Sequence, residues 1–256
     1  MRGLADKVVV VAGGGSGIGA ATARRLGAEG ASVVVGDLVG DNAAAVADEV
    51  REAGGRALSV PFDIADDASV AALVAAAVTE FGGLDAMHAN AADLSPETIG
   101  QDTNALEVSL DTFMHTLDVN LKGHLLCTRH ALPHLLARGG GALVYTSSAA
   151  GHIGEPERPS YAASKAGINS LVRHVASHWG RQGIRANSIA PGLVVTPAMD
   201  TGLPSEFRDY ALRVGRSPRL GRPDDIAGMV AFLVSDDGEW VNGQVLSVDG
   251  GASMRP

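Results

Sequence analysis

The sequence has little that would tie it to an oxidising compartment, a nucleic acid or a membrane. Cys127 is the only cysteine, so an internal disulfide and a cysteine-rich zinc site are excluded, and a reducing, cytoplasmic setting fits best. Acidic residues outnumber basic ones by 29 to 20, and the net charge of −9 disfavours non-specific binding to nucleic acid or anionic lipid. The apolar run Val8–Ala12 is interrupted by glycines, which makes it too short for a signal peptide or a membrane span.

Aromatic residues are also scarce, at 4%, whereas glycines number 33. Small residues suit tight packing of helices on a sheet and close approach of the backbone to a ligand. With 46% apolar residues, the 256-residue chain can bury a full core without a disulfide or metal. No linker or shift in composition divides it, so we expect a single domain over residues 1–256.

Short β-branched runs alternate with longer, alanine-rich amphipathic segments. Near-continuous apolar strands such as Val8–Val11 indicate a parallel sheet that is buried on both faces. The repeated strand–helix order predicts an α/β fold of the Rossmann type, with a doubly wound, parallel, seven-stranded sheet and helices on both faces. The predicted strands are Lys7–Ala12, Ser32–Gly36, Arg56–Pro61, Leu84–Asn90, Gly141–Ser147, Ile184–Ala190 and Gln244–Val248. The predicted helices are Ser16–Glu29, Asp41–Ala53, Asp66–Phe81, Leu110–Ala137, Tyr161–Arg181 and Pro223–Ser235.

Three segments, 93–107, 151–160 and 196–221, interrupt this alternation. Each can be interpreted as a surface loop. Each also follows the C-terminal end of a predicted strand, which is where open α/β sheets bind ligands. The last is long for a connection, which favours a lid or a small helical excursion, so we predict a substrate loop at about 194–221. For 93–107 and 152–159, substrate contact and a solvated loop are both compatible with the sequence.

Glycines 13, 17 and 19 lie between the first predicted strand and helix, in the sequence AGGGSGIG. Glycine permits a tight turn and lets the backbone approach a pyrophosphate, while the helix N-terminus offers free N–H groups. A structural turn alone would look similar. However, Asp37 ends the second strand 18 residues after Gly19, close to the spacing of a carboxylate that binds the adenosine ribose. We therefore interpret this region as a dinucleotide site rather than Asp37 as a helix cap.

Asp37 also bears on the choice of cofactor. A carboxylate accepts hydrogen bonds from ribose hydroxyls and repels a 2′-phosphate. Neither Leu38, which follows it, nor Ser16, which precedes Gly17, supplies an arginine. The expected cofactor is therefore NAD(H) rather than NADP(H). Asp63–Ile64 closes the third strand and could flank the adenine.

Tyr161 and Lys165 form the second strong motif. Four residues apart, they share one face if the segment is helical. A nearby lysine charge can lower the pKa of a phenol, so that it acts as acid or base near neutral pH. An ordinary surface pair is the alternative, since YxxxK alone occurs by chance. Ser148, which follows the fifth strand and lies 13 residues before Tyr161, strengthens the functional interpretation.

Together these motifs resemble the short-chain dehydrogenase/reductase family, in its subfamily of roughly 250 residues, over nearly the whole chain. The family's TGxxxGxG matches residues 12–19 with Ala12 in place of threonine, and its NNAG matches 89–92 only in part, with Ala89 and Ala92. These departures affect the rigidity of the cofactor bed rather than the chemistry. Further family positions fall on Asn120, Ser148, Tyr161, Lys165, Pro191, Gly192, Val194 and Thr196, and the ending 242–251 is also typical.

The resemblance implies hydride transfer between a nicotinamide and a carbinol or carbonyl carbon. It implies that Tyr161 exchanges the proton with the substrate oxygen and that Ser148 holds that oxygen. It further implies that Lys165 binds the nicotinamide ribose and favours the phenolate, and that Asn120 anchors a water joining Lys165 to solvent. The implied cofactor contacts are Gly13, Ser16, Gly17, Ile18, Gly19, Asp37, Asp63, Ile64, Asn90, Tyr161, Lys165, Pro191, Gly192, Val194 and Thr196, with Val194 and Thr196 at the carboxamide.

The histidine pairs 130/134 and 174/178 have the i, i+4 spacing of zinc ligands on a helix. No third ligand is recognisable nearby and the resemblance implies no metal chemistry, so we expect no metal and place these side chains on helix surfaces. His152, Glu155, Glu157 and Arg158 either contact substrate or belong to a solvated loop. Cys127, within a predicted helix, is interpreted as a core residue.

The leading hypothesis is an NAD-dependent enzyme acting on a hydrophobic secondary alcohol or ketone. A 3-oxoacyl thioester reductase is the alternative, disfavoured by Asp37 because that role usually uses NADPH. An enoyl reductase would space its tyrosine and lysine more widely, and a related sugar epimerase would have GxxGxxG and a longer chain. A non-catalytic NAD-binding regulatory protein would not need the set Asn120, Ser148, Tyr161 and Lys165. A hydrophobic, cyclic or steroid-like substrate is suggested by Met199, Leu203, Phe207 and Tyr210.

The resemblance also implies a homotetramer, or at least a dimer. The predicted helices 110–137 and 161–181 carry apolar residues on more than one side, and exposed apolar patches are rarely tolerated in monomers. Pairing these helices across a two-fold axis would bury the patch. The alternative is a monomer in which all of them face the core. The residues concerned are Leu117, Leu121, Leu125, Leu132, Ile168, Leu171, Val172 and Val175.

Overall fold

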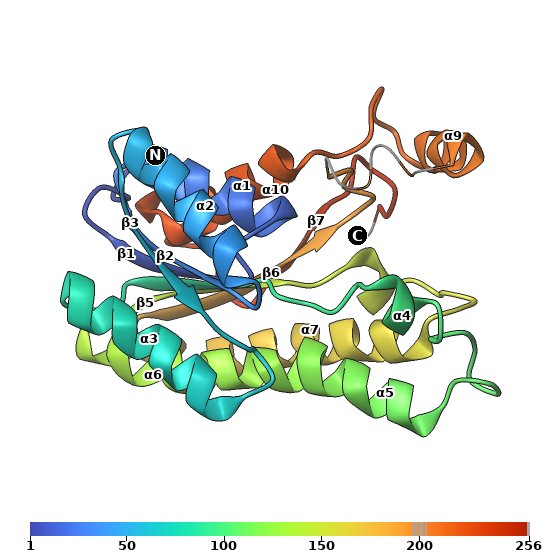
Figure 1. Ribbon diagram of the computed structural model, residues 1–256, viewed down its shortest axis with the longest axis horizontal. Coiled ribbons are helices and arrows are strands. Elements are labelled where there is room, and N and C mark those ends of the chain that lie inside the picture. The colour runs from blue at the N-terminus through green and yellow to red at the C-terminus, as the bar shows by residue number, and fades with distance from the viewer. Residues whose placement is uncertain (197–198, 200–201, 203, 255–256) are drawn as a thin grey trace.

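The computed structural model describes residues 1–196, 199, 202 and 204–254. Its centre is one parallel sheet in the order β3-β2-β1-β4-β5-β6-β7, which confirms the predicted seven-stranded α/β fold (Figure 1). The order reverses between β1 and β4, and in such sheets the crevice at the reversal binds ligands. The strands are β1 Val8–Ala12, β2 Ser32–Asp37, β3 Arg56–Pro61, β4 Ala86–Ala89, β5 Gly141–Thr146, β6 Ile184–Pro191 and β7 Val245–Val248.

Helices cover both faces of the sheet, as expected for right-handed crossovers between parallel strands. In Figure 1, α1, α2 and α10 lie on one face, and α3, α5, α6 and α7 lie on the other. The main helices are α1 Gly17–Ala28, α2 Gly40–Glu52, α3 Asp67–Phe81, α5 Leu110–Leu117, α6 Gly123–Ala137, α7 Pro159–Trp179 and α10 Pro223–Val234. None of the helices within the described ranges is both long and apolar enough to cross a membrane.

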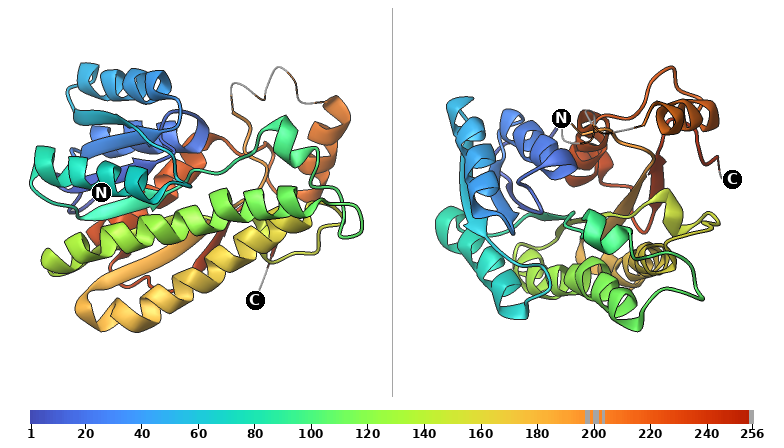
Figure 2. Two further views of the ribbon diagram at one scale, coloured as in Figure 1. Left: turned by 60° about the horizontal axis from the view of Figure 1, so that its bottom comes forward. Right: turned by 45° about the vertical axis from the view of Figure 1, so that its right-hand side comes forward.

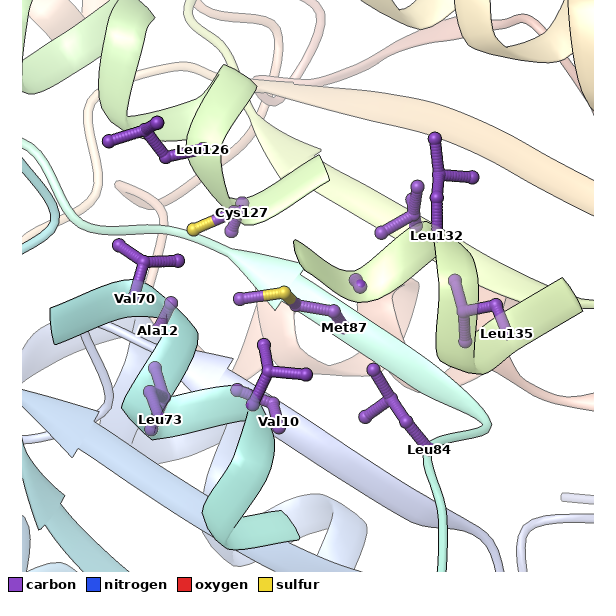
Figure 3. Close-up of a cluster of buried hydrophobic side chains, with 14 of the residues drawn as sticks. Val10, Ala12, Val70, Leu73, Leu84, Met87, Leu126, Cys127, Leu132 and Leu135 are labelled. Atoms are coloured by element: carbon purple, nitrogen blue, oxygen red, sulfur yellow. The ribbon is translucent and has the colours of Figure 1, made fainter. Parts of the chain in front are cut away.

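Each face of the sheet has its own apolar core, because successive strand residues point to opposite sides. All five residues of β1 are buried; Val8 and Val10 join the core under α3, α6 and α7, whereas Val9 and Val11 join the core under α1, α2 and α10. Figure 3 shows Val10 and Met87, from neighbouring strands, among side chains of α3 and α6. These two cores hold the strand ends, and the loops that follow them, in fixed positions.

The helix predicted over 110–137 is interrupted in the structure. A five-residue π-helical turn, η1 (Asp118–Lys122), separates α5 from α6. Such turns are rare and occur frequently at functional sites, because they rotate one side chain out of the regular register. Here the turn contains the buried Asn120. The helix predicted from Tyr161 begins two residues earlier, at Pro159, and ends in a short 3₁₀ turn, η3 (Gly180–Gln182).

The three irregular segments all leave the carboxyl end of the sheet, as predicted. The first contains a short helix, α4 (Pro96–Ile99), and the third contains α9 (Ser205–Val214), a helical excursion of the kind expected there. Figures 1 and 2 show α4 and α9 at the same edge of the sheet. The segment after β5 holds a 3₁₀ turn, η2 (Ala149–Gly151), next to the start of α7. The candidate site is therefore built where these loops meet.

Candidate active site

The glycine-rich turn between β1 and α1 is formed as the sequence predicts. Gly13 has a φ of +86°, and the N–H groups of Gly13 and Gly14 both donate to the Gly36 oxygen at 2.8 Å. A side chain at Gly19 would collide with the turn, since its Cβ would lie 1.8 Å from the Gly13 oxygen. Ser16 precedes α1 without a side-chain cap, which leaves N–H groups of the first helical turn available to an anion.

The Asp37 carboxylate faces this turn from the end of β2. Its Oδ2 accepts a 2.8 Å hydrogen bond from the Gly15 N–H, and its Oδ1 accepts one from Val39 at 3.1 Å. A carboxylate has about four acceptor positions, so two bonds leave room for others. β3 ends at Pro61, so Asp63 and Ile64 lie in the loop beyond the strand rather than at its end. Asp63 Oδ1 accepts from the Ala65 N–H at 2.8 Å, whereas Ile64 is 5% exposed and packs in the core.

Asn90, at the end of β4, is held by protein at both ends of its amide. Its Nδ2 donates to the Gly13 oxygen at 2.8 Å, and its Oδ1 accepts from Thr146 Oγ1 at 2.8 Å. Thr146 Oγ1 also lies 2.9 Å from Nε2 of the buried His88. Since the threonine hydroxyl donates to Asn90, His88 Nε2 is the donor in that pair. Asn90 thus ties the glycine turn to the ends of β4 and β5.

The loop after β6 reaches back to the start of α1. The Gly192 N–H donates to the Val248 oxygen at 3.3 Å, and Val194 pairs with Gly221 in an isolated bridge. The Thr196 methyl lies 3.2 Å from the position that a Cβ on Gly17 would occupy. Pro191, the last residue of β6, is buried. Leu203 and the Phe207 side chain lie outside the described residues.

Tyr161 lies in the first turn of α7, beside Ser148. Burial raises the pKa of the Tyr161 phenol, while a hydrogen bond with Ser148 and the positive charge of Arg158 act in the opposite direction. The Arg158 guanidinium carbon lies 5.6 Å from the ring centroid and the Lys165 Nζ lies 5.5 Å from it. Ser148 Oγ accepts from the Ala150 N–H at 3.2 Å, which fixes the serine side chain at the end of β5.

Lys165 is 1% exposed, one turn along α7 from Tyr161. Its Nζ donates to the Thr146 main-chain oxygen at 3.0 Å. Burial lowers the pKa of Lys165 to about 7, so the amine is charged only in part at neutral pH. Burial outweighs the effect of Ser148 and Arg158, so the pKa of the Tyr161 phenol lies above its ordinary value, and Lys165 is not among the groups that shift it. The role of Lys165 toward the phenol stays a prediction.

Asn120 is fully buried in the π-helical turn. Its Oδ1 accepts a 2.9 Å hydrogen bond from the N–H of Asp93, the first residue of the loop 93–107. Its Nδ2 has no hydrogen-bond partner among the described residues. An unpartnered buried donor is costly in a protein interior unless a water or ligand meets it. The amide therefore suits the predicted role of anchoring a water.

Sequence reasoning did not single out Asp102 or the pair His88–Thr146, which lie beside the predicted site residues. The Asp102 carboxylate accepts the free N–H groups at the start of α7, and it is 2% exposed. The signal in the sequence was indirect: the residue before Pro159 is Arg158 rather than Ser, Thr, Asp or Asn, so the helix needs a cap from elsewhere, but nothing local identifies Asp102 as that cap. The sequence left Arg158 open between substrate contact and a solvated loop. In the structure its guanidinium pairs with Glu155 at 2.5 Å.

The histidine pairs do not form a metal site with other side chains in the described ranges, where no group of three or more ligating residues occurs. His130 Nε2 instead lies 2.9 Å from Asp67 Oδ1, a carboxylate that the sequence analysis had not placed nearby. The rings of His174 and His178 gather around Trp179 on the surface of α7. Cys127 is a core residue, as predicted, and burial raises the pKa of its thiol to about 12.

The chain matches one family over most of its length. A family model described as enoyl-(acyl carrier protein) reductase matches residues 12–253. Among curated proteins, the chain is 44% identical to cis-4-hydroxycyclohexanecarboxylate dehydrogenase of Sinomonas cyclohexanicum, covering 97% of each chain. It is 37% identical to cyclohexanol dehydrogenase of an Acinetobacter species, covering 98% of this chain and 96% of the relative.

A solved structure is similar throughout. The 7α-hydroxysteroid dehydrogenase complexed with NADH and 7-oxo glycochenodeoxycholic acid superimposes with a TM-score of 0.90 at 33% identity. The match covers 98% of this chain and 95% of that one. The similarity therefore includes the loops at the carboxyl end of the sheet as well as the sheet itself.

Proposed function

The chain belongs to the short-chain dehydrogenase/reductase family, and from that premise we propose that it transfers a hydride between NAD(H) and a secondary alcohol or ketone. The observation that carries the proposal is that Ser148, Tyr161 and Lys165 lie together at the carboxyl end of the strands. A phenol held by a serine hydroxyl and a buried amine is equipped to exchange a proton with a substrate oxygen.

The residues present fit a dinucleotide. A Cβ at Gly13, Gly14, Gly15 or Gly19 would lie less than 3.0 Å from neighbouring atoms, so the turn needs glycine at these positions. The first turn of α1 has N–H groups without a side-chain cap, which suit a pyrophosphate. Asp37 would accept hydrogen bonds from ribose hydroxyls, which supports NAD(H) over NADP(H). Val194 and Thr196 would hold the carboxamide. When bound, the nicotinamide supplies or accepts the hydride, and the protein orients and polarises the reacting groups.

In this proposal each of the four predicted catalytic residues has its own role in proton transfer. Tyr161 Oη exchanges a proton with the substrate oxygen, and Ser148 Oγ holds that oxygen by a hydrogen bond. Lys165, fixed on the Thr146 oxygen, binds the nicotinamide ribose and favours the phenolate when its amine is protonated. Asn120 Nδ2, free of protein partners in the described chain, holds the water through which protons reach solvent.

The alternatives are less well supported. The family model is described as an enoyl reductase, but the spacing of Tyr161 and Lys165 favours an enzyme acting on a carbinol carbon, in line with the named dehydrogenase relatives. A 3-oxoacyl thioester reductase remains the second candidate within the class, opposed by Asp37. A regulatory NAD-binding protein would not need a buried lysine beside a tyrosine.

We further propose a hydrophobic cyclic alcohol or ketone as substrate. Two of the relatives are named for cyclohexane alcohols, and the similar structure is a steroid dehydrogenase. The loop at 194–221 offers Met199 and Tyr210, which are 40% and 56% exposed and free to cover an apolar molecule.

Turnover tests the proposal directly. A panel of cyclohexanols, hydroxysteroids, linear secondary alcohols and a 3-oxoacyl thioester, followed at the NADH absorbance with NAD(H) and NADP(H), should give activity with cyclic secondary alcohols and NAD(H). Activity confined to the thioester with NADPH would favour the second candidate. NADH binding without turnover of any compound would favour the regulatory protein.

We also propose that the protein assembles as a homotetramer in the cytoplasm, the lone cysteine supporting a reducing compartment. The apolar residues that support assembly in the structure differ in part from those that the sequence suggested. Ile168, Val172 and Val175 of α7 are fully buried against the sheet, so they do not form the patch. Exposed apolar side chains instead follow α5 and α6: Leu110 is 80%, Met114 54% and Leu125 50% exposed. The exposed side of α7, which is in contact with α5, carries the small residues Ala163, Ala166 and Ser170.

A further inference from the structure

The start of α7, which carries Tyr161, lacks a cap of its own. The residue before the helix is Arg158, whose side chain makes no capping hydrogen bond, and Pro159 has no N–H to offer. The Ala162 N–H donates to the Arg158 oxygen at 3.0 Å, as in any helix. The N–H groups of Ser160 and Tyr161 are left without acceptors in the helix.

Asp102 accepts both of them from the loop 93–107. Its Oδ1 accepts from the Ser160 N–H at 3.1 Å and from the Ser160 hydroxyl at 2.7 Å. Its Oδ2 accepts from the Tyr161 N–H at 2.9 Å. At 2% exposure, a carboxylate is costly unless hydrogen bonds and an opposing charge stabilise it, and the positive end of the helix dipole supplies that charge.

The main chain at Asp102 is tied to the same place. The Arg158 N–H donates to the oxygens of Asp102 and Thr103, both at 3.0 Å. Arg158 has a φ of +61°, a conformation that costs energy for a residue other than glycine and persists only where its surroundings enforce it. This bend directs the Arg158 guanidinium to within 5.6 Å of the Tyr161 ring centroid.

The same loop contacts a second predicted catalytic residue at its other end. The Asp93 N–H donates to Asn120 Oδ1 at 2.9 Å. Asp93 in turn accepts hydrogen bonds from Thr98 Oγ1 at 2.7 Å and from His115 Nε2 at 2.8 Å, which anchor it to α4 and α5. The loop 93–107 therefore connects Asn120, through Asp93, with the start of the helix that carries Tyr161, through Asp102.

We propose that Asp102 is a positioning residue for Tyr161: it fixes the first turn of α7 and thereby the place of the phenol relative to Ser148 and Lys165. The inference rests on the proposed function, since it assigns Tyr161 the proton transfer. Asp102 touches neither substrate nor cofactor in this role. Its effect passes through the two N–H groups, and a small displacement of a reacting group can cost about a hundredfold in rate.

The test compares Asp102→Asn and Asp102→Ala with the control Asp85→Asn. Asp85 also accepts a hydrogen bond from a backbone N–H, that of Val8 at 2.8 Å, but at the amino end of the strands, away from the proposed site. Asparagine keeps the size of Asp102 but presents a donor to one of the two N–H groups. The measurements are kcat and KM with the best alcohol of the panel, the Kd of NADH by fluorescence, and amide hydrogen exchange in peptides covering 160–164, all well below the unfolding midpoint.

For both Asp102 variants we expect kcat to fall at least about tenfold, the Kd of NADH to stay within about threefold, and exchange at 160–164 to quicken. The Asp85→Asn variant should change none of the three. Faster exchange with unchanged kcat, or unchanged exchange, would overturn the proposal. If the wild-type protein turns over no substrate, the proposed function fails, whereas the exchange measurement still decides whether Asp102 holds the helix start.

Discussion

Lys165 Nζ donates a 3.0 Å hydrogen bond to the main-chain oxygen of Thr146. This bond joins the helix that carries Tyr161 to the end of β5, one residue before Ser147 and two before Ser148. The amine is fully buried, and the bond to a neutral carbonyl compensates only in part for the loss of water, so the pKa of Lys165 is lowered to about 7. Burying the charged form of Lys165 lowers the stability of the fold. The proposed chemistry nevertheless requires a lysine at this position.

That cost makes stability depend on pH in a defined window. The unfolded chain keeps Lys165 protonated up to its ordinary pKa of 10.5, whereas the folded chain releases the proton near pH 7. Between these values the unfolded state binds more protons, so stability increases as pH rises. We expect the free energy of unfolding of the wild type to rise, relative to Lys165→Met, by about 1 kcal/mol per pH unit from pH 7.5 to 9.

The measurement is urea denaturation of both proteins at several pH values in the absence of NAD(H). Other titrating groups are common to the two chains and cancel in the difference. If the free energies of unfolding of the two proteins change in parallel from pH 7.5 to 9, the pKa of Lys165 in the folded state is not lowered.

The Tyr161→Phe variant tests the proton-transfer role. The substitution keeps the ring in contact with its neighbours and removes only the hydroxyl, so folding and NADH binding should be preserved. Turnover should fall by about a hundredfold or more, in line with the contribution of general acid–base groups. Steady-state kcat and NADH fluorescence titration measure the two effects. A variant that binds NADH normally and turns over at the wild-type rate would remove Tyr161 from this role.

The sequence was most informative where a local pattern has a direct structural consequence. The run Val8–Ala12 predicts a buried parallel strand because its residues are apolar on both faces, and the glycines after it predict a tight turn. Asp102 could not be found this way, since its partners lie 58 and 59 residues along the chain and only folding brings them together. The π-helical turn at Asn120 was also missed, because its residues Asp118–Lys122 include no glycine or proline that would mark an interruption of the helix.

The Asp37 carboxylate sets the third prediction, the choice of cofactor. A hydrogen bond from a ribose hydroxyl to a charged acceptor contributes about 1.5–3 kcal/mol, and a 2′-phosphate would meet repulsion instead. We expect at least a tenfold preference for NAD(H) over NADP(H) in kcat/KM. Asp37→Asn should narrow that preference, whereas Asp41→Asn, an exposed carboxylate in the first turn of α2, should leave it unchanged. Equal or better use of NADP(H) by the wild type would contradict the assignment.

We expect the proposed assembly to depend on the exposed apolar side chains of α5 and α6. Leu110, Met114 and Leu125 would remain in water in a monomer, and a two-fold axis beside α5 and α7 would bury them against the same residues of a second chain. Light scattering after size exclusion at micromolar concentration should give a mass near four chains, with a dimer as the smaller alternative. A clean monomer would contradict assembly but leave the catalytic assignment intact.

A charge placed in this patch should weaken the association selectively. Leu125→Glu puts a carboxylate at a position that is 50% exposed in a single chain and would be desolvated in the pair. The mass should therefore fall to that of a smaller species, with little change in the secondary structure seen by circular dichroism. Ala45→Glu, on the exposed side of α2 at the other face of the sheet, adds the same charge away from the patch and should keep the wild-type mass. If both variants keep that mass, the chains associate through another surface; if both lose it, the added charge acts through stability rather than through the patch.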